Sequence, residues 1–163
     1  MNGIRSEFGE REMHLDLPSA HSAGRMARRM VAEYAASEGV PESELATLEF
    51  VAGELIDNAI DHGGGGGALE ASDLEGDVRM NLWVSLGPNR WSVLVEDQGG
   101  GKAEDLEPLI HPPDGIPDLM DERGRGFFLL AQMVDELTVE ASRDALGLGF
   151  RAARSYVKGE EPE

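Results

Sequence analysis

The sequence predicts an α+β fold, a two-layer α/β sandwich in which helices cover one face of a mostly antiparallel sheet. Short segments that alternate apolar and polar residues, as strands do, occur near both ends of the chain and in its middle. Two long segments with helical periodicity follow each other directly near the start. Because strands and helices do not alternate regularly, we do not expect a doubly wound parallel sheet.

The first half of the chain is expected to hold one strand and two helices. Residues 13–17 alternate as an edge strand does, and Pro18 ends them. Apolar residues then recur at helical spacing from Ser22 until residues 39–41, where glycine stops one helix and proline opens the next. This second helix should run over residues 42–62, and the five glycines after it predict a flexible exit.

The second half is expected to hold a hairpin, a lid, a helix and two closing strands. Residues 99–120 contain four glycines and four prolines among acidic residues, which is too broken for a helix or a strand and typical of a lid or binding loop. We expect the hairpin strands at 78–84 and 91–95, the helix at 126–136 and the closing strands at 137–140 and 150–157.

Length and composition fit one domain, with 163 residues of which 40% are hydrophobic. We expect this domain over residues 12–158, with a loose tail at 1–11 and a short one at 159–163. The absence of cysteine excludes disulfides and thiol chemistry. Because we find no apolar run of about 20 residues and no apolar signal core near Met1, we expect a cytoplasmic protein without membrane contact.

The chain is strongly acidic, with 32 Asp and Glu against 14 Lys and Arg and a formal net charge of −18 at pH 7. Such a surface repels the phosphates of nucleic acids, so direct DNA or RNA binding is disfavoured. The excess of acidic residues serves either solubility or the docking of a basic protein partner, and charge alone does not choose between the two.

The second predicted helix carries a stripe of polar side chains in its last turns. Glu54, Asn58, Asp61 and His62 lie at i, i+4, i+7 and i+8 and so share one side of the helix. A carboxylate and a carboxamide one turn apart supply the oxygen ligands that Mg²⁺ prefers. The alternative is a solvated helix face on which His62 complements the C-terminal dipole.

Asp97 stands where the second hairpin strand ends and the chain turns. Glycines at positions 99–101 let the backbone approach a ligand closely there. The carboxylate can accept a hydrogen bond from an amino group such as the exocyclic amine of adenine. The alternative is an ordinary turn that Asp97 caps.

The segment Gly124-Arg125-Gly126 opens the predicted third helix. The first N–H groups of a helix lack intrahelical partners and attract anions, so a phosphate would fit there. Arg123 and Arg125 could add bidentate contacts to phosphate oxygens. Alternatively, both arginines pair with nearby acidic residues. The segment is not a Walker loop, because the required Gly-x-x-x-x-Gly-Lys pattern does not occur.

In this order, the three segments resemble a known family. Glu-x-x-x-Asn-Ala-x-x-His-Gly at 54–63, Asp-x-Gly-x-Gly at 97–101 and Arg-Gly-Arg-Gly-Phe at 123–127 are similar to the N, G1 and G2 boxes of the GHKL ATPase superfamily. Within it, the chain resembles the anti-sigma factor serine/threonine-protein kinases over nearly all of residues 12–158. The resemblance implies a Bergerat-type ATP-binding fold.

The resemblance also implies roles for the residues that match the first two boxes. Asn58 would ligate the Mg²⁺ bound to the phosphates of ATP, and Asp97 would receive the adenine amino group. Gly99 and Gly101 would let the backbone pass close to the base. Glu54 would be the general base that takes the proton of an attacking serine hydroxyl.

The third box would bind the phosphates. Gly124 and Gly126 would give backbone contacts, and either Arg123 or Arg125 would face the γ-phosphate. The chain departs from the family in three places. Phe150 stands where members usually carry a threonine that supports the adenine-binding aspartate, the phosphate turn is short, and the glycine run lengthens the loop at the mouth of the site.

The activity implied by the resemblance is that of an ATP-dependent protein serine kinase. It would phosphorylate an anti-sigma factor antagonist and sequester a sigma factor, and a homodimer is compatible with it. The alternative is a non-catalytic module that uses ATP to set its affinity for a partner, which is disfavoured because a pure binder needs no base at Glu54. The ATPase portion of a histidine kinase is also disfavoured, because we find no upstream helical hairpin with a phosphoacceptor histidine.

Overall fold

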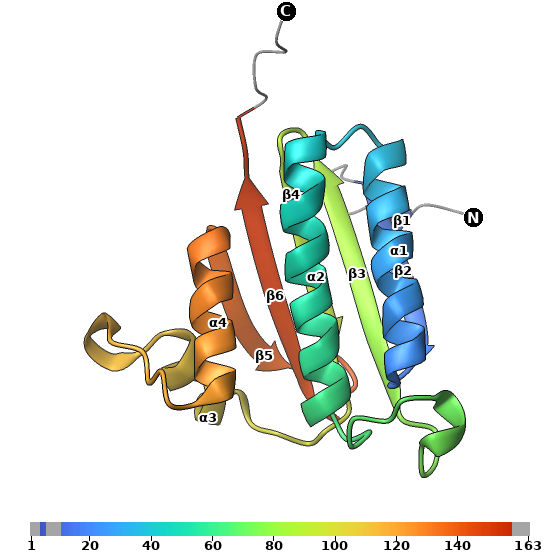
Figure 1. Cartoon of the computed structure of the whole chain (residues 1–163), viewed down its shortest axis with the longest axis vertical. Coiled ribbons are helices and arrows are strands. Elements are labelled where there is room, and N and C mark those ends of the chain that lie inside the picture. The colour runs from blue at the N-terminus through green and yellow to red at the C-terminus, as the bar shows by residue number, and fades with distance from the viewer. Residues whose placement is uncertain (1–3, 6–10, 158–163) are drawn as a thin grey trace, which may run out of the picture.

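A computed structural model describes residues 4–5 and 11–157 of the chain. The elements are β1 (Ile4–Arg5), β2 (Arg11–Pro18), α1 (His21–Ser37), α2 (Glu42–His62), β3 (Arg79–Gly87), β4 (Arg90–Glu96), α3 (Ala103–Ile110), α4 (Glu122–Met133), β5 (Glu136–Ala141) and β6 (Leu148–Ser155), with short 3-10 turns at Ala71–Asp73 and Pro113–Gly115. All neighbouring strands pair antiparallel, in the order β1-β2-β3-β4-β6-β5. Helices α1, α2 and α4 lie on one face of this sheet (Figure 1). The predicted two-layer α+β sandwich is confirmed.

Helix α2 crosses the middle of the sheet, between α1 and α4 (Figure 1). Its predicted bounds are confirmed, and its apolar stripe is buried in the core. Helix α1 packs closely against it because α1 turns small residues inward. A Cβ atom on Gly24 would lie 2.8 Å from Cδ1 of Ile60 and 3.1 Å from Cγ2 of Ile56, so the two helices approach closely at this crossing.

The central hairpin is also confirmed, although both of its strands extend beyond the predicted ranges. Val84 pairs with Val93 and Leu82 with Val95, and their side chains are buried against the helices. Asn89 makes the turn with a φ of 56°, a conformation that asparagine tolerates better than most residues. Asp97 directly follows β4 and lies next to Gly63, at the C-terminal end of α2.

The prediction that residues 99–120 lack regular structure is wrong, because helix α3 forms within them. Ala103, Leu106 and Ile110 lie at i, i+3 and i+7 and share one face, and Ile110 is buried in the core. Pro108 lies inside the helix and conceals this periodicity in the sequence. Between α3 and α4 the chain forms only a short 3-10 turn, and a lid function of this segment stays a prediction.

Helix α4 begins at Glu122, four residues before the predicted start at residue 126. Asp121 is its N-cap, and its Oδ1 accepts the N–H of Gly124 at 3.0 Å. An aspartate cap therefore sets the helix start, and the interpretation of Gly124-Arg125-Gly126 as the opening of the helix is wrong. The closing strands β5 and β6 form close to their predicted positions.

The ends of the chain are described only in part. Ile4 and Arg5, which we expected in a loose tail, form strand β1 and pair with the start of β2. The rest of the predicted tail up to residue 10, and the tail at 159–163, lie outside the described residues. Within the described part of the chain, every helix is too short or too polar to span a membrane.

Candidate functional site

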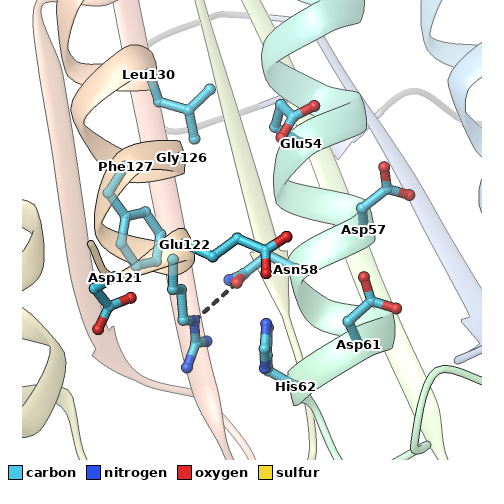
Figure 2. Close-up of a pocket in the computed structure, with 11 residues that line it drawn as sticks. Glu54, Asp57, Asn58, Asp61, His62, Asp121, Glu122, Gly126, Phe127 and Leu130 are labelled. Carbon is cyan, nitrogen blue, oxygen red and sulfur yellow. Dashed lines mark hydrogen bonds between the residues drawn. The ribbon is translucent and has the colours of Figure 1, made fainter. Parts of the chain in front are cut away.

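A cavity of about 550 Å³ lies between α2 and α4 (Figure 2). The four residues of the predicted polar stripe, Glu54, Asn58, Asp61 and His62, all line it. Helix α4 supplies the opposite wall. The full lining is Glu54, Asp57, Asn58, Asp61, His62, Asp121, Glu122, Arg123, Gly126, Phe127 and Leu130.

A second cavity, of about 130 Å³, lies at the C-terminal end of α2. Its lining is His62, Asp97, Gly99, Gly101, Lys102, Asp105, Leu106, Arg123 and Leu148. His62 and Arg123 line both cavities and therefore lie at their boundary. The fold thus brings the three motif segments to one continuous region of the molecule.

Asn58 and Arg123 are joined across the larger cavity. The Nε–H of Arg123 donates a hydrogen bond to Oδ1 of Asn58 at 2.9 Å, drawn as the dashed line in Figure 2. The amide nitrogen of Asn58 is buried and has no hydrogen-bond partner among the described residues. Buried amide groups are nearly always paired, so this one is available to a ligand.

The guanidinium of Arg123 lies over two aromatic rings. Its Cζ is 5.7 Å from the ring centroids of both Phe127 and Phe150, and the two rings stack on each other at 5.5 Å. Burial lowers the pKa of Arg123, while the carboxylates of Asp97 and Asp121 raise it. An arginine remains charged under these conditions, so a cation occupies the boundary between the cavities.

Phe150, which departs from the family pattern, is fully buried beneath the site. It lies opposite Val95 in the sheet and supports Arg123 from below. A threonine hydroxyl at this position could donate a hydrogen bond, whereas the phenyl ring offers only apolar and cation–π contacts. In this chain, Phe150 therefore contacts the guanidinium of Arg123 through its ring.

Glu54 lies on α2 one turn before Asn58. Burial is the main cause that raises its pKa, the charge of Asp57 raises it further, and Arg28 lowers it. A carboxylate with a raised pKa is a better proton acceptor once it is ionised. Its position and its basicity both suit a general base.

The two aspartates of α2 are engaged with α1, on the side of α2 away from α4 (Figure 2). The ring Nε2 of His21 lies 2.8 Å from Oδ1 of Asp61, and Arg28 pairs with Asp57. The members of the predicted polar stripe therefore have different partners: Asp61 links α2 to α1, whereas Asn58 contacts Arg123 of α4.

Asp97 is held rigidly by the backbone around it. Its Oδ1 accepts the N–H groups of Gly99 and Leu148, each at 3.0 Å, and its own N–H donates to the carbonyl of Leu148 at 2.9 Å. The residue is 4% exposed, at the wall of the smaller cavity. Its position is therefore set before any ligand binds.

Three glycines make this close packing around Asp97 possible. A Cβ atom on Gly147 would lie 2.3 Å from Oδ1 of Asp97, and one on Gly63 would lie 2.5 Å from the Cβ of Asp97. A Cβ on Gly99 would lie 2.8 Å from the Cα of Gly63. Any side chain at these positions would displace Asp97 or the end of α2. Gly101, by contrast, faces the flexible end of Leu148.

In the glycine run after α2, where we expect a flexible exit, two glycines pack closely against other parts of the chain. Gly63 lies against Asp97, and a Cβ on Gly65 would lie 2.8 Å from the carbonyl oxygen of Ser19. Gly64, Gly66 and Gly67 adopt positive φ angles, which side chains rarely allow. A Cβ atom on Gly66, by contrast, would meet no atom within 4 Å, and the flexibility of the run stays a prediction.

The structure separates the two arginines of the third motif. Arg123 lines both cavities, whereas Arg125 is exposed and donates from Nη1 to the carbonyl of Leu119 at 2.8 Å. The N–H of Gly124 is already bound by Asp121, and Gly126 lies inside α4, where it lines the larger cavity. Of these residues, Arg123 and Gly126 line the larger cavity.

Sequence reasoning missed several residues of the site. Glu122 extends from α4 toward α2 in Figure 2 and adds a carboxylate to the larger cavity, and Lys102 adds a cation to the smaller one. Phe127 and Phe150 lie against the guanidinium of Arg123, and together with Asn58 they form what we call the seat of Arg123. Glu122 directly precedes Arg123, and Lys102 directly follows Gly101. Their position next to motif residues is the sequence signal that could have indicated them.

Comparison with solved structures supports the fold. The crystal structure of the SiaB–SiaC complex from Pseudomonas aeruginosa contains a chain that matches this one with a TM-score of 0.60 and 16% sequence identity. The match covers 86% of this chain and 88% of that one. At this identity it shows the shared architecture.

Comparison with curated sequences finds several proteins named anti-sigma F factor. The proteins from Bacillus velezensis and Bacillus subtilis are 25% and 26% identical over 147 residues, which cover 90% of this chain and 94% of theirs. The protein from Geobacillus stearothermophilus is 28% identical over 130 residues, which cover 80% of this chain and 83% of that protein. The family of histidine kinase-like ATPase domains matches residues 17–149. The chain therefore belongs to this ATPase family, as the three motifs and their arrangement around one site predict.

Proposed function

We propose that this chain is an ATP-dependent protein serine kinase that phosphorylates an anti-sigma factor antagonist and sequesters a sigma factor. Membership of the ATPase family implies ATP binding. Adenine would occupy the smaller cavity with its amino group on Asp97, and the phosphates would extend into the larger cavity toward Asn58 and Gly126. The two cavities share a boundary, so one nucleotide could reach both.

The residues present fit a single Mg²⁺ carried by the nucleotide. Asn58 offers one amide oxygen, and the described residues contain no group of three or more His, Asp or Glu that could hold a metal alone. Mg²⁺ commonly takes few protein ligands and keeps phosphate oxygens and waters as the others. When bound, the ion would neutralise charge on the phosphates.

The position of Glu54 is the observation that carries the kinase proposal. It shares the larger cavity with Asn58, and burial raises the pKa of its carboxyl group. Glu54 would accept the proton from a serine hydroxyl as the serine oxygen bonds to the γ-phosphorus. The bond from that phosphorus to the β–γ bridging oxygen breaks, and ADP leaves with its electron pair.

The proposed partners draw on the curated relatives. Proteins named anti-sigma F factor match at least 80% of this chain. The substrate would be a small antagonist domain that presents a serine at the open side of the larger cavity. The acidic surface suits a basic region of a sigma factor, with a formal charge of −18 on this chain.

Transfer of labelled phosphate from ATP to a purified anti-sigma factor antagonist domain tests the proposal. Glu54→Ala should lower transfer by about 100-fold or more, because the base is lost, while calorimetry should find ATP affinity within about threefold of wild type. Glu49→Ala, an exposed glutamate of the same helix, is the matched control and should transfer normally.

Two results would change the proposal. Transfer by Glu54→Ala at the wild-type rate would remove Glu54 from the mechanism, and Glu122→Ala would then test the second carboxylate of the cavity. ATP binding by the wild type without any transfer would favour the non-catalytic module that sets partner affinity.

A further inference from the structure

Arg123 divides the space that the proposed nucleotide would occupy. It lines both the cavity that contains Asn58 and the cavity that contains Asp97. A nucleotide that spans both cavities must pass the guanidinium. The side chain therefore either moves or prevents binding.

Arg123 is held where it stands by contacts from three elements. Asn58 of α2 accepts its Nε–H at 2.9 Å, while Phe127 of α4 and Phe150 of β6 lie beneath the guanidinium. The bond to Asn58 also occupies the amide oxygen that the proposed Mg²⁺ would need. The seat thus closes the phosphate side of the site while the Asp97 side stays open.

We propose that Arg123 is a gate that makes the site selective for nucleotides with a polyphosphate, an inference that rests on the proposed ATP site. Any ligand that crosses the boundary breaks the Arg123–Asn58 hydrogen bond. ATP offsets this loss, because the released guanidinium can pair with phosphate oxygens and the phosphates engage Asn58 through the metal ion. Adenosine, with its base on the Asp97 side, would place its ribose at the boundary and break the same bond, but it has no phosphate to pair with the released guanidinium.

Arg125 provides the internal contrast. It is two residues away and carries the same charge, but it is exposed, binds the Leu119 carbonyl and lines neither cavity. A general effect of positive charge near the phosphates would involve both arginines. A gate involves Arg123 alone.

Calorimetric titration of the full chain with adenosine, and separately with Mg²⁺ and ATP, tests the gate. Arg123→Ala should bind adenosine more tightly than wild type, by about threefold or more, because the variant has no Arg123–Asn58 hydrogen bond for the ligand to break. It should bind ATP about tenfold more weakly, because the contact between the guanidinium and the phosphates is lost. The ratio of the two affinities should therefore fall by roughly 30-fold. Arg125→Ala should leave this ratio unchanged.

A second variant and a second readout guard against misfolding of Arg123→Ala. Arg123→Lys keeps the charge but loses the Nε–H donor and the planar stacking, and it should also bind adenosine more tightly. In NMR spectra of the wild type, the Nε–H signal of Arg123 should shift on addition of ATP.

The outcomes separate the gate from the proposed function. If the wild type binds ATP but neither variant gains affinity for adenosine, or if Arg125→Ala changes the affinity ratio equally, the gate is wrong and the ATP site stands. If the wild type does not bind ATP at all, the proposed function fails together with the gate.

Discussion

The two cavities that meet at Arg123 differ in how ready they are for a ligand. At the smaller one, backbone N–H groups of Gly99 and Leu148 fix the carboxylate of Asp97, and glycines pack against it. At the larger one, the oxygen of Asn58 is taken by Arg123 and its amide nitrogen is unpaired. One side of the site is preformed, whereas the other must rearrange.

This contrast has a physical cause. Asp97 is positioned by main-chain bonds between neighbouring strands, which are part of the fold itself. Arg123, in the first turn of α4, is positioned by side-chain contacts, so a rotation of the side chain can release it. Changes to the packing around Asp97 should therefore affect both folding and binding, while changes on the Asn58 side should affect binding alone.

The largest expected effect is on the preformed side, at Gly147. Gly147→Ala would place a Cβ atom 2.3 Å from Oδ1 and 2.4 Å from the carbonyl oxygen of Asp97, so the strand end must shift. We expect the free energy of unfolding in urea to fall by about 3 kcal/mol. Gly126→Ala, in open space on α4, is the control and should raise it by about 0.5 kcal/mol. Equal stability of the two variants would show that the packing of Gly147 against Asp97 is not rigid.

The next effect is on nucleotide affinity, through Asp97 itself. Asp97→Asn retains an oxygen for the N–H groups of Gly99 and Leu148, so the fold should persist. The amide presents a donor instead of an acceptor to the adenine amino group, and we expect ATP affinity to fall by about tenfold to 100-fold. Unchanged affinity by calorimetry would mean that adenine lies elsewhere.

The smallest effect is on the pH dependence of transfer. Glu54 accepts a proton only when ionised, and its raised pKa means that transfer should fall as the pH drops through that raised value. Because the charge of Asp57 is the second cause of the rise, Asp57→Asn should move this acidic limb to lower pH. Asp61→Asn, which is not among those causes, should leave the limb in place. A shift to higher pH in Asp57→Asn would contradict the assignment.

Much of this arrangement could be predicted from the sequence because it is local. The bounds of α2 follow from its apolar stripe between Pro41 and the glycine run, and the central hairpin follows from its alternation. The motif spacing within residues 54–63 predicts Glu54 and Asn58 on one side of α2, and both line the larger cavity. Local patterns succeed where a single element decides the outcome.

Apart from the start of α4, which the local cap Asp121 sets, the misses arise where distant residues decide. Helix α3 tolerates Pro108 because its apolar face packs on the core, which no local pattern reveals. The seat of Arg123 joins residues 65 positions apart in the sequence, Asn58 and Arg123, to Phe150 on another strand. The packing of Gly63 against Asp97 likewise depends on two elements that meet only in the folded chain.

A crystal structure of this chain with Mg²⁺ and a non-hydrolysable ATP analogue tests the central claim most directly. We predict the adenine amino group on Asp97, the metal ion on the oxygen of Asn58, Glu54 facing the γ-phosphate, and Arg123 moved away from Asn58. A nucleotide bound outside the two cavities, or bound between them with the Arg123–Asn58 hydrogen bond intact, would contradict the account.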